Sequence, residues 1–107
     1  MYETIKTEDT QGFHIVFSVR PEDIHPRASF DDSCHDIEDI CNKIDNGTYV
    51  WFIARVEAYR HGVLLATDYL GGCLYENYQD FLSDGYYEDM VSNVIAEATQ
   101  TIEKLAA

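Results

Sequence analysis

The sequence has few basic residues for its size. Seven Lys and Arg stand against twenty Asp and Glu in 107 residues, which gives a formal net charge of −13. Proteins that hold nucleic acid directly use basic groups to displace counterions from phosphates, and anionic membranes attract the same groups. The charge balance therefore disfavours direct binding to nucleic acid or to an anionic membrane. It favours a cationic partner, either a basic protein surface or a divalent ion.

Long hydrophobic runs and a targeting segment are also lacking. No apolar run approaches the roughly 18 residues of a membrane span. The first ten residues, MYETIKTEDT, have neither the basic start nor the apolar stretch of a secretion signal. Three cysteines without a CxxC pair do not indicate a disulfide framework. We therefore expect a cytoplasmic protein with reduced, mostly packed thiols and no membrane association.

Metal-binding motifs are weak. Structural zinc sites usually have paired ligands about two to four residues apart, whereas Cys34 and Cys41 are farther apart and Cys73 stands alone. The stretch DNGTYVWF has the glycine of a calcium loop but not its alternating acids or its final glutamate. We expect packed cysteines, no metal site and no cofactor.

Catalytic motifs are missing as well. No serine or cysteine lies in a nucleophile elbow, and the four histidines fall in regions of different predicted structure. Carboxylate pairs that could act in glycoside hydrolysis arise by chance when twenty of 107 residues are acidic. We therefore predict that the protein is not an enzyme and has no catalytic residues.

Enough hydrophobic residues are present, 46% of the chain, to build the core of a single domain over residues 1–107. Hydrophobic periodicity and turn residues predict strands at 2–6 and 13–20, a helix at 30–45, a hairpin within 48–73 that turns at His61-Gly62, a short helix at 77–84 and a helix at 87–105. This is an α+β fold of ββαββα-like order. We expect a single antiparallel sheet of about four strands, with helices packed on one face.

The hairpin within 48–73 carries the strongest strand pattern. Its first strand places one set of alternating residues on the face that we expect to form the core: Val50, Phe52, Ala54, Val56 and Ala58. In its second strand, Gly71-Gly72 should end the strand or form a bulge, because glycine weakens strand interiors.

The predicted helix FDDSCHDIEDICNKID has an apolar stripe and a negative face. Its stripe consists of Cys34, Ile37, Ile40, Cys41 and Ile44. On a helical wheel Asp32, Asp36 and Asp39 fall within about 60° of one another. Carboxylates so placed lie inside one Debye length of about 8–10 Å and reinforce one another's field. A solvated helix face is the simpler interpretation of any one such cluster.

Aromatic residues leave two interpretations open. In the first, Tyr59, Tyr69 and Tyr75 pack in or beside the sheet. In the second, exposed aromatics anchor a protein interface, where Tyr and Trp are enriched. The candidates for that role are Trp51, Tyr86 and Tyr87.

In size and charge, over its whole length, the chain resembles the small acidic inhibitors of bacterial defence that phages and plasmids encode. These are the anti-CRISPR and anti-restriction proteins, several of which are DNA mimics. The stretch from Leu65 to Val91 is also similar to small mobile-element proteins of unknown function. For a phage-encoded protein, the resemblance implies a location in the host bacterial cytosol.

The leading hypothesis is a non-enzymatic inhibitor that binds a basic, nucleic-acid-handling protein, such as a CRISPR effector or a restriction enzyme. Its acidic surface would occupy a groove of Arg and Lys that holds phosphates. The predicted partner-binding residues are Asp31, Asp32, Asp36, Glu38, Asp39, Asp80, Asp84, Glu88 and Asp89.

An alternative hypothesis gives the acidic residues no partner. The protein would then be a structural or adaptor protein whose charge only keeps it in solution. It could form a homodimer through an exposed strand edge or through the Tyr-rich segment. The sequence is compatible with a monomer or a homodimer.

Overall fold

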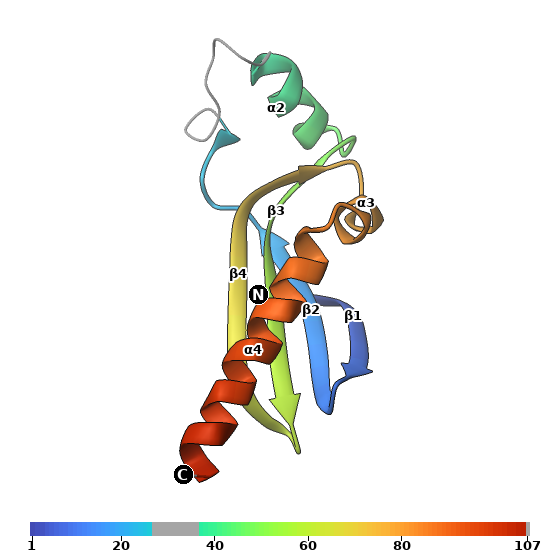
Figure 1. The fold of residues 1–107 in the computed structure, drawn as a ribbon. Helices are drawn as coiled ribbons and strands as arrows, with labels where there is room; N and C mark the ends of the chain where they lie inside the picture. The colour runs from blue at the N-terminus through green and yellow to red at the C-terminus, as the bar shows by residue number, and fades with distance from the viewer. Residues whose placement is uncertain (27–36, 107) are drawn as a thin grey trace.

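The computed structural model describes residues 1–26 and 37–106. The elements in chain order are β1 (Glu3–Thr10), β2 (Phe13–Pro21), α2 (Ile37–Asp45), β3 (Val50–Arg60), β4 (Val63–Tyr75), α3 (Tyr78–Ser83) and α4 (Tyr86–Ala106). All four strands form one antiparallel sheet in the order β1-β2-β3-β4 (Figure 1). The predicted α+β class with a single antiparallel sheet is confirmed. The order differs slightly from ββαββα, because α3 and α4, which correspond to the two helices predicted at 77–84 and 87–105, both follow β4.

Both hairpins turn through two residues with positive φ. Gln11 and Gly12 have φ of 51° and 84°, and His61 and Gly62 have φ of 53° and 78°. This is the type I′ geometry, whose twist matches that of paired strands. The turn predicted at His61-Gly62 is confirmed. The first strand was predicted too short, because its polar residues are exposed on an edge strand that continues to Thr10.

One face of the sheet forms the hydrophobic core. The alternation predicted for β3 is confirmed, since Val50 is half-buried and the next four residues of its set are at most 1% exposed. The pairing of β2 with β3 puts alternate β2 residues on the same face. These buried β2 residues are Phe13, Ile15, Phe17 and Val19.

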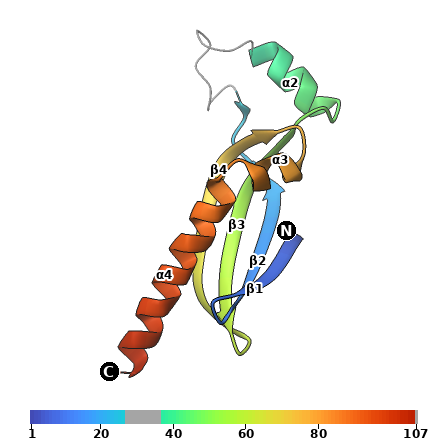
Figure 2. The same ribbon diagram turned by 45° about the vertical axis from the view of Figure 1, so that its right-hand side comes forward.

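Helices α3 and α4 cover this face (Figures 1 and 2). Small residues let α4 lie close to β3 and β4, since Ala58, Ala66 and Ala98 are all buried in one cluster. The helix continues beyond the edge of the sheet (Figures 1 and 2). Leu105, near the C-terminal end of α4, is therefore 78% exposed.

Phe81 of α3 lies at the centre of an aromatic cluster and is fully buried. Its ring centroid is 5.4 Å from that of Phe17, 5.6 Å from that of Phe52 and 5.4 Å from that of Tyr75. The stacked and edge-on geometries are those that aromatic pairs prefer. This cluster joins α3 to three strands and fixes the position of the short helix.

The opposite face of the sheet carries a polar network. The Arg55 guanidinium lies 3.8 Å from the centroid of the Tyr2 ring, donates to Ser18 Oγ at 3.3 and 3.1 Å, and pairs with Glu57 at 3.2 Å. Tyr59 also donates its hydroxyl to Glu57, at 3.1 Å. Glu57 is only 7% exposed, and these partners compensate its buried charge.

A bulge interrupts β4 at Gly71-Gly72, one of the two outcomes predicted for this pair. Between the ladder pairs of Leu70 and Cys73, two residues of β4 face one residue of β3. Gly72 has a φ of 67°, and its N–H donates to Glu22 Oε2 at 3.2 Å. The bulge thus ties β4 to the chain that follows β2.

Helix α2 stands beyond the end of the sheet rather than over its face (Figures 1 and 2). Of its predicted stripe, Cys34 lies outside the described residues, Ile37 is buried, and Ile40, Cys41 and Ile44 are half-buried. With α4 projecting at the other end, the molecule measures 53 × 24 × 23 Å. Its radius of gyration is 16.2 Å, against about 13 Å for a compact chain of this length.

Candidate functional site

The acidic residues predicted around α2 are only partly described. Outside the described residues lie Asp31, Asp32 and Asp36. The row of three carboxylates therefore stays a prediction. Glu38 and Asp39 lie in the first turn of α2 and are exposed. Asp39 pairs with Lys43, four residues later, at 3.0 Å, and this contact raises the pKa of Lys43. The described part of the helix thus carries both signs of charge.

The other predicted acids gather on the short helix α3 and the first turn of α4. We define the α3–α4 acidic surface as Glu76, Asp80, Asp84, Glu88 and Asp89. All five are exposed, and the two helices are in contact. Four of them were predicted from the sequence. Glu76, which immediately precedes the cap of α3, was not among the predicted binding residues.

Cations do not neutralise this surface within the described residues. Every described ion pair involves acids elsewhere, on the sheet, on α2 or just after β2. The sequence contributes to the difference, because no Lys or Arg occurs between Arg60 and Lys104 and any cation would have to come from elsewhere in the chain. The acids of the α3–α4 acidic surface therefore have no ion-pair partner among the described residues, whereas several other acids are paired.

Local hydrogen bonds hold the ends of these helices in place. The Asn77 side chain caps α3 by accepting a hydrogen bond from the Asp80 N–H at 2.9 Å. Tyr75 donates its hydroxyl to Asp84 Oδ2 at 2.7 Å. Burial and this bond raise the pKa of Tyr75. In the first turn of α4, Glu88 and Asp89 complement the helix dipole. These local contacts leave the exposed acids able to contact a partner as well.

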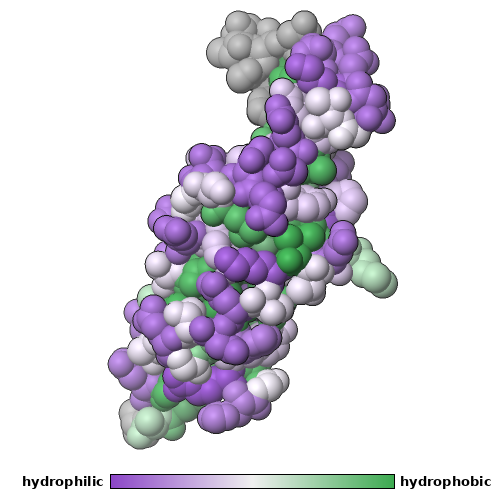
Figure 3. Space-filling view, turned by 90° about the vertical axis from the view of Figure 1, so that its right-hand side faces the viewer, coloured by the Kyte–Doolittle hydropathy of each residue, from purple (hydrophilic) through white to green (hydrophobic). Residues whose placement is uncertain are grey.

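Figure 3 shows the side of the molecule that carries α3 and β1. Hydrophilic residues cover α2 at the top of the view and spread over most of this side. Hydrophobic residues are visible at its centre. A partner that approaches this side would meet a mainly polar surface.

The predicted interface aromatics separate into exposed and buried residues. Tyr86 is 51% exposed beside the α3–α4 acidic surface. Trp51 is buried and donates its indole N–H to the Ile24 carbonyl at 2.8 Å. Tyr87 is buried and donates its hydroxyl to Glu8 Oε1 at 3.2 Å. Of the three predicted anchors, only Tyr86 is therefore available to a partner.

Tyr69, which we expected to pack in or beside the sheet, is instead 58% exposed on β4. Tyr59 and Tyr75 are half-buried, as predicted. The misplacement arises because β4 is an edge strand, and strand order cannot be read from the alternation of residues along one strand.

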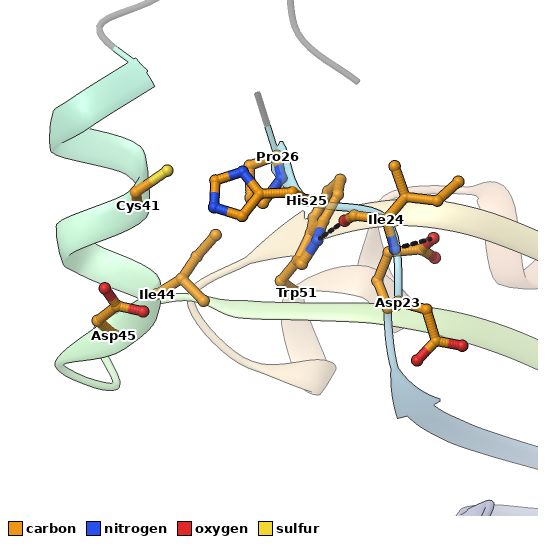
Figure 4. A pocket seen from close by; sticks show the side chains of 9 residues that line it. Asp23, Ile24, His25, Pro26, Cys41, Ile44, Asp45 and Trp51 are labelled. Carbon is orange, nitrogen blue, oxygen red and sulfur yellow. Dashed lines mark hydrogen bonds between the residues drawn. The ribbon is translucent and has the colours of Figure 1, made fainter. Parts of the chain in front are cut away.

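A pocket of about 240 Å³ lies between α2 and the chain that follows β2. Cys41 and Ile44 of α2 point toward His25 and Trp51 across it (Figure 4). The thiol and imidazole suggest a metal site. Within the described residues, however, no three His, Cys, Asp or Glu side chains are placed to hold a metal ion.

The described histidines do not converge on a nucleophile. His14 pairs with Asp9 at 2.8 Å on the first hairpin, His61 lies in the second turn, and His25 lines the pocket beside α2. In the described part of the chain, Cys41 lines the same pocket as His25.

Cys73 is predicted to be chemically inert in the folded protein. It is 4% exposed, and its burial raises the pKa of the thiol to about 11. At pH 8 its thiolate fraction should be about a hundredfold below that of an ordinary thiol. Iodoacetamide treatment followed by peptide mass spectrometry should modify the half-buried Cys41 while leaving Cys73 intact. Equal modification rates in the native protein would contradict the described packing, and both thiols should react in urea.

No family model, curated protein or solved structure matches this chain. None of the described helices is long and apolar enough to cross a membrane.

Proposed function

We propose that the protein is a non-enzymatic inhibitor that binds a basic, nucleic-acid-handling protein, such as a CRISPR effector or a restriction enzyme, in the place of the nucleic acid. Its binding surface is the α3–α4 acidic surface. Glu38 and Asp39 of α2 are proposed as further contacts, together with the predicted binding residues Asp31, Asp32 and Asp36, which lie outside the described residues.

The observation that carries this proposal is an unneutralised set of carboxylates on two adjoining helices. The five carboxylates are exposed, and the chain from residue 61 to residue 103 supplies no Lys or Arg to pair with them. Like charges gathered in this way destabilise the free protein through mutual repulsion. Contact with a basic groove relieves that repulsion, because the Arg and Lys side chains of the groove supply the missing cations.

Electrostatics also determines the expected kinetics of binding. A protein of charge −13 is attracted by a basic groove over distances comparable to the Debye length, about 10 Å at 0.1 M salt. Such steering raises the association rate and makes the affinity fall as salt rises. The exposed ring of Tyr86 supplies an aromatic contact beside the carboxylates, and Tyr is enriched in interfaces.

Capture from a bacterial lysate on the immobilised protein tests this proposal. At low salt the column should retain nucleic-acid-binding proteins, and a salt gradient should release them. Nuclease treatment of the lysate should increase the yield, because native nucleic acid competes for the same grooves. Retention of proteins without nucleic-acid-binding activity, or retention unaffected by salt, would overturn the proposal.

A further inference from the structure

Strand β4 is an open edge of the sheet with little charge. β1 and β4 are the two outer strands of the sheet. Within the described residues, β4 makes no backbone–backbone hydrogen bond other than those to β3. Its thirteen residues, VLLATDYLGGCLY, contain one charged residue, Asp68. By contrast, β1 carries Lys and several acids in eight residues. Charged side chains protect an edge strand from pairing, so by charge β1 is the better protected of the two.

The β4 edge also exposes apolar side chains. Val63 is 58% exposed, Leu64 is 47% exposed and Tyr69 is 58% exposed. Beyond this edge, α4 extends past the sheet (Figures 1 and 2) and leaves Leu105 78% exposed and Ile102 half-buried. Ile102 still packs against the core, and Leu105 lies where this chain has no sheet to cover it.

We infer that the β4 edge binds a second copy of this chain, so that two sheets join antiparallel into one continuous sheet. The inference is independent of the proposed function. A strand edge alone buries less than the roughly 1,200 Å² of a stable interface. The projecting end of α4 supplies further area, because it reaches over the side on which the second copy would lie.

The distribution of charge favours a second copy of this chain as the partner that binds the β4 edge. Two chains of −13 repel each other, so they can associate only where acids are sparse. The β4 edge meets this requirement, and a two-fold axis would keep the two α3–α4 acidic surfaces on different parts of the assembly. A basic partner has little reason to choose this edge, because Asp68 is the sole acid within β4 and the neighbouring Glu22 is bound to the Gly72 N–H.

Bulges restrict the length of β4 that can pair with the strand of a second copy. Bulges at Gly71-Gly72 and beside Leu65 bracket five residues, Ala66 to Leu70, that keep regular register with β3. Within them the Tyr69 N–H donates to the Asp68 side chain at 3.0 Å. In the inferred dimer, this N–H would donate to a carbonyl of the neighbouring strand in place of the Asp68 side chain.

Sedimentation velocity of the pure protein at about 0.05 M and about 0.5 M salt tests this inference. The mass should approach twice 12.3 kDa as concentration rises, and association should strengthen at high salt, because screening weakens the repulsion. Salt has the opposite effect on binding to a basic partner, so the two proposals fail independently. A monomer at all concentrations and both salts would overturn the inference.

Lysine substitutions on the two edge strands test whether the dimer interface lies at β4. Tyr69→Lys and Leu64→Lys should each weaken self-association at least about tenfold, because a lysine on an edge opposes strand pairing. Both positions are about half exposed, and circular dichroism should show an intact fold. Thr4→Lys on the exposed edge strand β1 makes the same change in charge and should leave association unchanged. Equal loss in Thr4→Lys, or a dimer unaffected by both β4 variants, would contradict the inference.

Discussion

Neutralising four of the five acids of the α3–α4 acidic surface should reduce binding to the proposed basic partner by about 100-fold at low salt. The variant combines Asp80→Asn, Asp84→Asn, Glu88→Gln and Asp89→Asn. Exposed charge pairs contribute roughly 0.2–1 kcal/mol each, so four of them amount to about 1–4 kcal/mol, and 1.4 kcal/mol is tenfold in affinity. Surface plasmon resonance at several salt concentrations measures the loss, most of which should lie in the association rate.

A matched pair of double variants tests whether position matters or only net charge. Glu88→Gln with Asp89→Asn removes two charges from the first turn of α4, and Glu97→Gln with Glu103→Gln removes two exposed charges from the same helix farther along. The first pair should weaken binding about tenfold. The second should change it little. If both pairs have equal effects, the protein acts through its overall charge and not through the α3–α4 acidic surface.

The neutral variants should remain folded. Asparagine at position 84 can still accept the hydrogen bond from Tyr75. Loss of the favourable dipole contact at Glu88 and Asp89 costs roughly 0.3–1 kcal/mol each, and relief of the repulsion among these acids offsets part of it. Thermal unfolding of each variant separates a loss of binding from a loss of structure.

Phe81→Ala should lower the free energy of unfolding by about 3–5 kcal/mol, the usual cost of removing a buried phenylalanine. The side chain is fully buried among rings from β2, β3 and β4. Its removal leaves a cavity that the rigid sheet cannot close. Urea unfolding followed by fluorescence measures the change, which for a domain of this size is a large part of the total stability.

Tyr86→Ala is the control for this prediction. Tyr86 contacts Phe81 with ring centroids 6.5 Å apart, but it is 51% exposed. Its truncation removes a similar volume without opening a buried cavity, and we expect a cost of about 1 kcal/mol. Equal destabilisation by the two substitutions would mean that α3 does not pack through Phe81 as described.

Period-2 and period-3.6 patterns were sufficient to predict most of the fold. The β3 alternation from Val50 to Ala58 placed the core correctly because this central strand is buried on its core face. The turn at His61-Gly62 followed from the need for positive φ at both residues. The edge strands were harder to predict. The extension of β1 to Thr10 and the exposure of Tyr69 both depend on which strands lie outermost in the sheet. Strand order is a long-range property that local patterns do not contain.

The candidate site was predictable in composition but not in arrangement. Asp80, Asp84, Glu88 and Asp89 were predicted because they are acidic, and the structure places them on two adjoining helices. Their lack of ion pairs within the described residues depends on where the few Lys and Arg fall in space. Asp39 is the opposite case. Its ion-pair partner, Lys43, is four residues away on the same helix, a spacing that the sequence shows directly. Burial of Trp51 under the chain after β2 was likewise a tertiary effect.

Competition between this protein and nucleic acid for one basic partner tests the central claim most directly. A captured nucleic-acid-binding protein, bound to labelled duplex DNA or RNA according to its specificity, is titrated with this protein while fluorescence anisotropy is recorded. The account predicts complete displacement of the nucleic acid, and displacement that is much weaker with the fourfold neutral variant. A stable ternary complex, in which the partner holds this protein and its nucleic acid together, would contradict it.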